Sequence, residues 1–238
     1  MSFSVDIIDA PDAWRLELTA ATQRLLGDTI ALSDNDWRDN TLLPSWSRAC
    51  VATHLAFHAE ALTEMTQTLI ETRESVTWRS HQRDEEIWMG ARRNAIALQE
   101  ALDQSSTVMF KALDQMDDHT WEIPVTTSHG PLPATTLVLD RLNEVIVHHI
   151  DLQLGVDFAD IEPELVRLLL KWNIFRATPR FSQVELTIIT DEGYSTTVGS
   201  GTPSTVRGTE VSLLGWITGR KDSSSILGAE ELNLIGPI

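Results

Sequence analysis

Apolar residues recur every three or four positions along most of the first 155 residues, which is the spacing of amphipathic helices. In residues 10–33, Trp14, Leu18 and Leu25 mark one such face, with Pro11 suited to the first turn. The same spacing predicts further helices over residues 46–72, 83–90 and 94–116, and a last one opened by Pro131 and Pro133 and ended by Gly155. Residues 73–82 and 117–131 read as irregular, with a short extended piece at residues 121–125.

The pattern changes after Gly155. A leucine-rich helix is expected over residues 164–177, beginning at Pro163. Residues 183–190 and 194–198 then alternate as strands on either side of an Asp-Glu-Gly turn, which predicts a hairpin. A third strand over residues 204–207 and a short helix over 209–218 complete this part. The prediction is therefore an α+β protein, with a four-helix bundle over residues 1–155 and a smaller α+β domain over residues 156–238.

The segment from Arg141 to Leu152 carries the strongest chemical signal in the sequence. Glu144 and His148 are four residues apart, so they share one helix face, and Arg141 and Asp151 flank them at three-residue steps. Most of the other side chains in this segment are apolar, which predicts burial. A buried carboxylate and imidazole must be paired or bind a cation, because an isolated buried charge is costly.

A second pair at the same spacing, His54 and His58, lies on the helix over residues 46–72. Two imidazoles and one carboxylate can hold zinc while leaving a fourth position open for a water or a thiol. His54, Glu144 and His148 are the candidate ligands, and the alternative is a salt-bridged pair beside a core histidine. His58 either hydrogen-bonds a substrate or closes the coordination sphere. Cys50, one turn before His54, is a nucleophile, a metal ligand or, as is commoner for a lone cysteine on a helix, a small buried residue.

Composition narrows the possible partners. The net charge of −17 disfavours nucleic acid and anionic lipid. The sequence contains no apolar run of the roughly 20 residues that a membrane span needs. One cysteine and an N-terminus without a signal peptide fit a cytoplasmic protein. Oligomeric state is not fixed by any of these features.

Three segments in this order resemble a known family. They are Leu43-Pro-Ser-Trp-Ser-Arg48 leading to His54, then Arg83-Asp-Glu-Glu-Ile87, then the segment from Arg141 to Leu152. Together they resemble the mycothiol-dependent maleylpyruvate isomerases and mycothiol S-transferases, within the DinB-like metal-binding bundles. The stretch over residues 206–220 resembles the smaller C-terminal domain of that family.

The resemblance implies a divalent metal, usually zinc, held by His54, Glu144 and His148, and mycothiol as the thiol partner. It also implies that Arg83 binds substrate and acts in catalysis, whereas its local sequence alone suggests a surface residue paired with its acidic neighbours. Relatives use the scaffold to isomerise maleylpyruvate or to attach mycothiol to electrophiles.

The chain departs from the family pattern near the expected cavity, which leaves the substrate more open than the metal. The four departures are Ser45, Cys50, His58 and Asn143. Those at Cys50 and His58 favour a mycothiol S-transferase acting on an electrophilic small molecule, with His58 contacting substrate. Arg83 favours the alternative, a maleylpyruvate isomerase. A non-enzymatic zinc-binding or sensor protein, with His58 as a fourth ligand, is the second alternative.

Overall fold

A computed structural model describes residues 11–78, 84–230 and 232. The chain divides after Leu154 into two compact units, each with its own secondary structure. The described part contains both helices and two small three-stranded sheets, which confirms the predicted α+β class. None of the described helices is long and apolar enough to cross a membrane.

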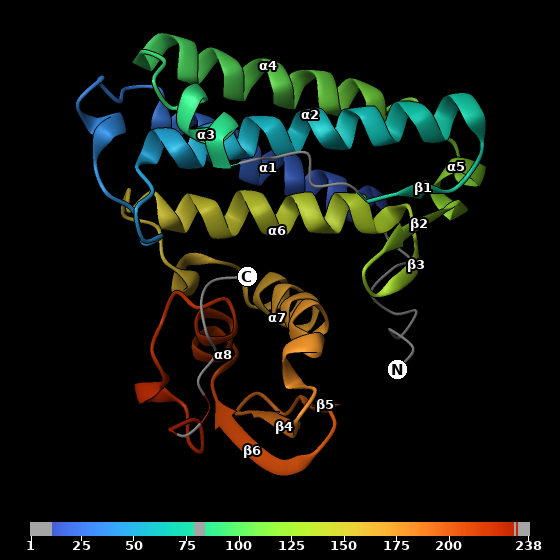
Figure 1. Ribbon diagram of the computed structural model, residues 1–238, viewed down its shortest axis with the longest axis vertical. Coiled ribbons are helices and arrows are strands. Elements are labelled where there is room, and N and C mark those ends of the chain that lie inside the picture. Colours follow the sequence, from blue (N-terminus) through green and yellow to red (C-terminus); the bar gives the residue numbers. More distant parts are fainter. Residues whose placement is uncertain (1–10, 79–83, 231, 233–238) are drawn as a thin grey trace. The chain divides into compact units, whose positions relative to one another are not determined.

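The N-terminal unit is built around four long helices, whose arrangement can be followed in Figure 1. They are α1 (Pro11–Thr29), α2 (Arg48–Thr72), α4 (Ala95–Leu113) and α6 (Thr135–Asp151). The α2 helix packs against α4 and α6, and α1 packs against the same two helices, so the four enclose one core. That core contains fully buried side chains from every helix, among them Leu18, Leu62, Met109 and Leu142. This is the four-helix bundle predicted from the spacing of the apolar residues.

The start of α2 is fixed by its first turn. Ser47 is the N-cap, and its hydroxyl accepts a hydrogen bond from the backbone N–H of Cys50 at 3.3 Å. The helix then continues to Thr72 and ends at Arg73, whose φ of 58° is left-handed.

Two short elements accompany the bundle, the 3₁₀ helix η2 (Asp36–Arg38) and the helix α3 (Asp84–Gly90). The α3 helix packs directly on α2. A Cβ atom added at Gly90 would lie 2.4 Å from Cγ2 of Thr53, closer than real Cβ contacts come. The absence of a side chain at Gly90 therefore sets how closely α3 approaches α2.

The region before α6 differs from the sequence prediction. Residues 121–125 were expected to be extended, and Pro124 and Val125 do lie in a strand, but Trp121 lies in the helix α5 (Asp118–Glu122). Pro131 and Pro133 do not open α6, because they lie in the strand β3 (Gly130–Pro133), which pairs with β2 (Pro124–Thr127). The predicted loop over residues 73–82 contains β1 (Val76–Thr77), parallel to β2. The α6 helix starts two residues later, at Thr135, and ends at Asp151, before Gly155.

The C-terminal unit combines helices with one three-stranded sheet. Its elements are η3 (Phe158–Asp160), α7 (Pro163–Ala177), η4 (Thr178–Phe181), β4 (Val184–Thr190), β5 (Ser195–Gly199), β6 (Thr202–Gly208), α8 (Glu210–Ile217) and η5 (Ser223–Ser225). The β4 strand lies in the centre, antiparallel to β5 and parallel to β6. Leu186 and Ile188 alternate with exposed or half-buried residues, as the sequence predicted for β4. An ion pair of 2.6 Å from Arg167 to Glu210 joins α7 and α8.

Candidate metal centre

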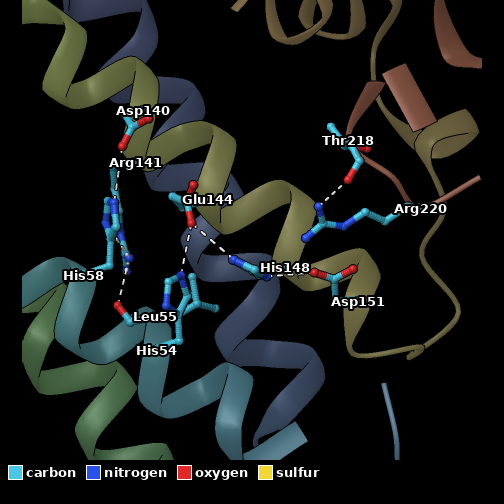
Figure 2. Close-up of polar contacts among 10 residues, drawn as sticks. All are labelled: His54, Leu55, His58, Asp140, Arg141, Glu144, His148, Asp151, Thr218 and Arg220. Carbon is cyan, nitrogen blue, oxygen red and sulfur yellow. Dashed lines mark hydrogen bonds and ion pairs between the residues drawn. The ribbon is translucent and has the colours of Figure 1, made fainter. Parts of the chain in front are cut away.

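The candidate ligands come from two facing helices of the bundle. His54 lies on α2, and Glu144 and His148 lie one turn apart on α6, which packs against α2. All 17 residues of α6 are buried, so its polar side chains must find partners inside the protein. The structure brings together the three residues that the sequence singled out as ligands (Figure 2).

Two of the three distances between the donor atoms are close to those that a bound metal requires. Oε2 of Glu144 lies 3.1 Å from Nε2 of His54 and 3.2 Å from Nε2 of His148. One ligand atom from each residue lies within 4.8 Å of the others. Zinc held tetrahedrally by ligands at about 2.0–2.1 Å needs neighbouring donor atoms about 3.3 Å apart. Two imidazoles and one carboxylate also form a typical donor set for catalytic zinc, so the residues present fit a divalent metal.

Asp151 holds His148 in the orientation that a ligand needs. Its Oδ2 accepts a hydrogen bond from Nδ1 of His148 at 2.7 Å, and Asp151 is fully buried. With a proton fixed on Nδ1, Nε2 is the nitrogen that faces Glu144, and its lone pair would be available to a metal once Nε2 is deprotonated. The pairing of an imidazole with a carboxylate behind it is a common arrangement around bound metals.

Burial and charge act differently on the two histidines. Burial lowers the pKa of His54 and outweighs the hydrogen bond to Glu144, so His54 favours the neutral form that binds metals. Burial also opposes the charged form of His148, but its hydrogen bonds to Asp151 and Glu144 together raise its pKa. A metal bound here would take the place of a proton between His148 and Glu144, so its affinity would fall as the pH falls.

His58 faces a different set of partners from those of His54. Its Nδ1 lies 3.4 Å from Nη1 of Arg141, and its Nε2 lies 3.3 Å from Oδ2 of Asp140. Because a guanidinium can only donate hydrogen bonds, Nδ1 of His58 accepts, and the ring proton lies on Nε2 and is donated to Asp140. In this tautomer the one free lone pair of the His58 ring is on Nδ1 and faces Arg141, so His58 does not offer a lone pair to a metal held by His54, Glu144 and His148.

Two tryptophan rings adjoin the histidines. The ring of Trp46 lies 5.5 Å from that of His54, and the ring of Trp78 lies 5.7 Å from that of His58, centroid to centroid. Both tryptophans are half-buried, so they combine apolar area with access to solvent. Neither was singled out from the sequence, where a tryptophan in a loop gives no signal of its own.

Three further residues bear on the site, and the structure describes two of them, Cys50 and His149. Arg83, the predicted catalytic and substrate-binding residue, lies outside the described residues. Cys50 is fully buried, and its sulfur accepts a hydrogen bond from the hydroxyl of Ser47. His149 points towards α1, where its Nε2 lies 3.0 Å from Oδ2 of Asp28.

Asp140 is the buried polar residue that the sequence reasoning missed. It precedes Glu144 by four residues, as Glu144 precedes His148, so the three form one ladder along α6. That spacing was the available signal. The apolar residues around Asp140 would have predicted its burial.

The fold and this cluster define a helical bundle with a candidate metal centre in its core. Residues 18–153 match the family described as the mycothiol maleylpyruvate isomerase N-terminal domain. The chain therefore belongs to this family of enzymes.

Two solved structures resemble the chain over 96% of its length and 96% of theirs. One is a mycothiol-dependent maleylpyruvate isomerase, with a TM-score of 0.80 and 21% identity. The other is a histidine-to-alanine mutant of a mycothiol-dependent maleylpyruvate isomerase, with a TM-score of 0.81 and 20% identity. No curated protein matches the sequence.

Proposed function

We propose that this protein is a mycothiol-dependent isomerase that acts on a small cis-unsaturated acid of the maleylpyruvate type. The convergence of His54, Glu144 and His148 in a buried site carries the proposal, together with the family and the printed names of the two structural relatives. The sequence favoured the S-transferase outcome, whereas the comparisons support the isomerase alternative better.

His54, Glu144 and His148 would supply three ligands to a divalent cation and leave its fourth coordination position open for a thiol. The cation, when bound, would stabilise the thiolate of mycothiol. That thiolate would add to the cis double bond, and its release after rotation about the resulting single bond would give the trans acid and return the thiol. Glu144 contributes one negative charge against the two of the cation, and the second charge is available to an anionic sulfur. Asp151 keeps Nε2 of His148 directed at the same point.

His58 is better placed to contact substrate than to bind the metal. Its Nε2 proton is shared with Asp140, which argues against the closed four-ligand site that a metal sensor would need. Trp46 and Trp78 provide apolar walls beside the two histidines of α2. In this proposal Arg83 binds the substrate carboxylate, an assignment that follows the family resemblance.

The decisive experiment follows the thiol as well as the product. Purified protein is given maleylpyruvate with and without mycothiol, and a chromogenic electrophile under the same conditions. We expect the cis acid to be isomerised through many turnovers with the mycothiol concentration unchanged, and activity to be lost in His54→Ala. Mycothiol consumed one for one with the electrophile, without isomerisation, would establish the transferase instead. Absence of thiol-dependent turnover with either substrate would refute both.

Arg83→Met, compared with Arg92→Met at an exposed position, tests the role of the arginine. Loss of a bidentate carboxylate contact should raise KM for the acid at least tenfold in Arg83→Met alone. Equal kinetics in the two variants would remove Arg83 from the site.

A further inference from the structure

A second cluster with the composition of a metal site lies one helical turn from the triad. His58, Asp140 and Glu144 are all buried, and one ligand atom from each lies within 4.8 Å of the others. The arrangement arises because His54 and His58 are one turn apart on α2, while Asp140, Glu144 and His148 are successive turns of α6. Two facing ladders thus offer two overlapping sets of ligands that share Glu144 (Figure 2).

A positively charged side chain already lies against the second cluster. The guanidinium of Arg141 is fully buried, with Nη1 donating to the carbonyl of Leu55 at 2.8 Å and to Nδ1 of His58 at 3.4 Å. In the described part of the chain, Nε and Nη2 of Arg141 have no hydrogen-bond partner. A buried guanidinium with two unsatisfied donors is costly, so hydrogen bonding alone does not account for this residue.

Electrostatics supply the missing reason. Burial lowers the pKa of Arg141 to about 10, with Glu144 and Asp140 opposing the shift, so the side chain stays charged at neutral pH. The carboxylates of Asp140, Glu144 and Asp151 bring three negative charges to this part of the core, against one from Arg141. One divalent cation at the triad balances the remainder, so a second would lie beside the guanidinium with no negative charge of the cluster left to offset it.

We propose that Arg141 takes the place of a second metal ion and keeps His58, Asp140 and Glu144 from binding one. It acts as a positioning residue, since it holds His58 in the tautomer whose Nε2 carries a proton. The lone pair that a metal would need is thereby turned towards Arg141. The bundle thus offers ligands for two cations, but the guanidinium of Arg141 occupies the position of the second, and only one metal ion binds. The inference rests on the proposed cation at the triad and is independent of the isomerase reaction.

The test is metal stoichiometry, which needs no substrate. Protein stripped with a chelator is dialysed against zinc, and bound metal is counted for the wild type and for Arg141→Met. We expect one equivalent in the wild type and two in Arg141→Met, with the second lost again when Asp140→Asn or His58→Gln is added. Arg48→Met, which removes an arginine that contacts Asp39 and the carbonyl of Leu152, should stay at one equivalent. One equivalent in a folded Arg141→Met, or two in the wild type, would overturn the proposal.

If Arg141→Met fails to fold, the tautomer can be measured in the wild-type protein. Nitrogen-15 NMR of the imidazole should show the proton of His58 on Nε2 and an unprotonated Nδ1 at neutral pH. The opposite tautomer would overturn the proposal without any variant. Neither measurement depends on activity, so both are distinguishable from a failure of the proposed function.

Discussion

The buried carboxylate of Asp151 allows a sharp test of how the triad is organised. Asp151→Asn keeps the size of the side chain but removes its charge and its requirement for a proton on Nδ1 of His148. In the wild type that hydrogen bond is 2.7 Å long and lies inside the protein, where charge-assisted bonds are strong. The asparagine amide can instead donate to Nδ1, which would move the ring proton to Nε2 and block metal binding.

The expected loss of metal affinity can be estimated from the known contribution of groups that hydrogen-bond to a metal-binding histidine. Replacing the group behind a metal-binding histidine typically lowers metal affinity about 10- to 100-fold. At about 1.4 kcal/mol for each factor of ten, this corresponds to about 1.4–2.8 kcal/mol. The carboxylate also raises the pKa of His148, so the measurement belongs at pH 8, where protons compete least with the metal.

The assay is competition for zinc between the protein and a chelator of known affinity. Asp28→Asn is the matched control. Asp28 also pairs with a histidine, since its Oδ2 lies 3.0 Å from Nε2 of His149, but His149 is the residue after His148 on α6 and is not part of the triad. We expect weaker zinc binding in Asp151→Asn and wild-type binding in Asp28→Asn. Equal affinity in a folded Asp151→Asn protein would refute the role given to this carboxylate.

Three further predictions concern the framework that positions the site. Ser47→Ala should lower the free energy of unfolding by about 1 kcal/mol in urea denaturation, because the first turn of α2 loses its cap; an unchanged midpoint would contradict this. Gly90→Ala should lower the free energy of unfolding by about 1–3 kcal/mol, because the added methyl group clashes with Thr53. Adding Thr53→Ser should restore part of that stability, and a double variant as unstable as Gly90→Ala would show that the clash is not with Thr53. Hydrogen bonds to Arg73 hold the pKa of Asp117 well below its usual value of 3.8. The ionised carboxylate therefore contributes its full stabilisation above pH 3.8, and this contribution is lost as the pH falls from there towards the lowered pKa. The stability difference between wild type and Asp117→Asn should therefore narrow below pH 3.8, and a constant difference would exclude the linkage.

The long helices and the pair of Glu144 and His148 could be predicted from the sequence because their signals are local. Glu144 and His148 share a face through spacing alone, and the apolar residues around them indicate burial. What the sequence could not supply was the partner of each polar group across the bundle. That Arg141 contacts His58, and that Asp140 faces the same ring, depends on how α2 and α6 are aligned.

The small sheet near the bundle was missed for a related reason. Its strands are two to four residues long, too short for alternation to be recognised. Pro131 and Pro133 looked like the start of a helix but lie at the edge of the sheet, where a residue without an N–H is tolerated. The pairing of Val76 with Val125 joins segments almost fifty residues apart, which no local pattern predicts.

The central claim is that His54, Glu144 and His148 hold one cation and leave a coordination position open for the sulfur of a thiol. X-ray absorption at the zinc edge of the loaded protein, before and after addition of mycothiol, tests it most directly. We expect a first shell of nitrogen and oxygen alone, into which a sulfur neighbour at about 2.3 Å enters when the thiol is added. A shell that stays free of sulfur, or a fourth protein ligand already in place before the thiol, would contradict the account.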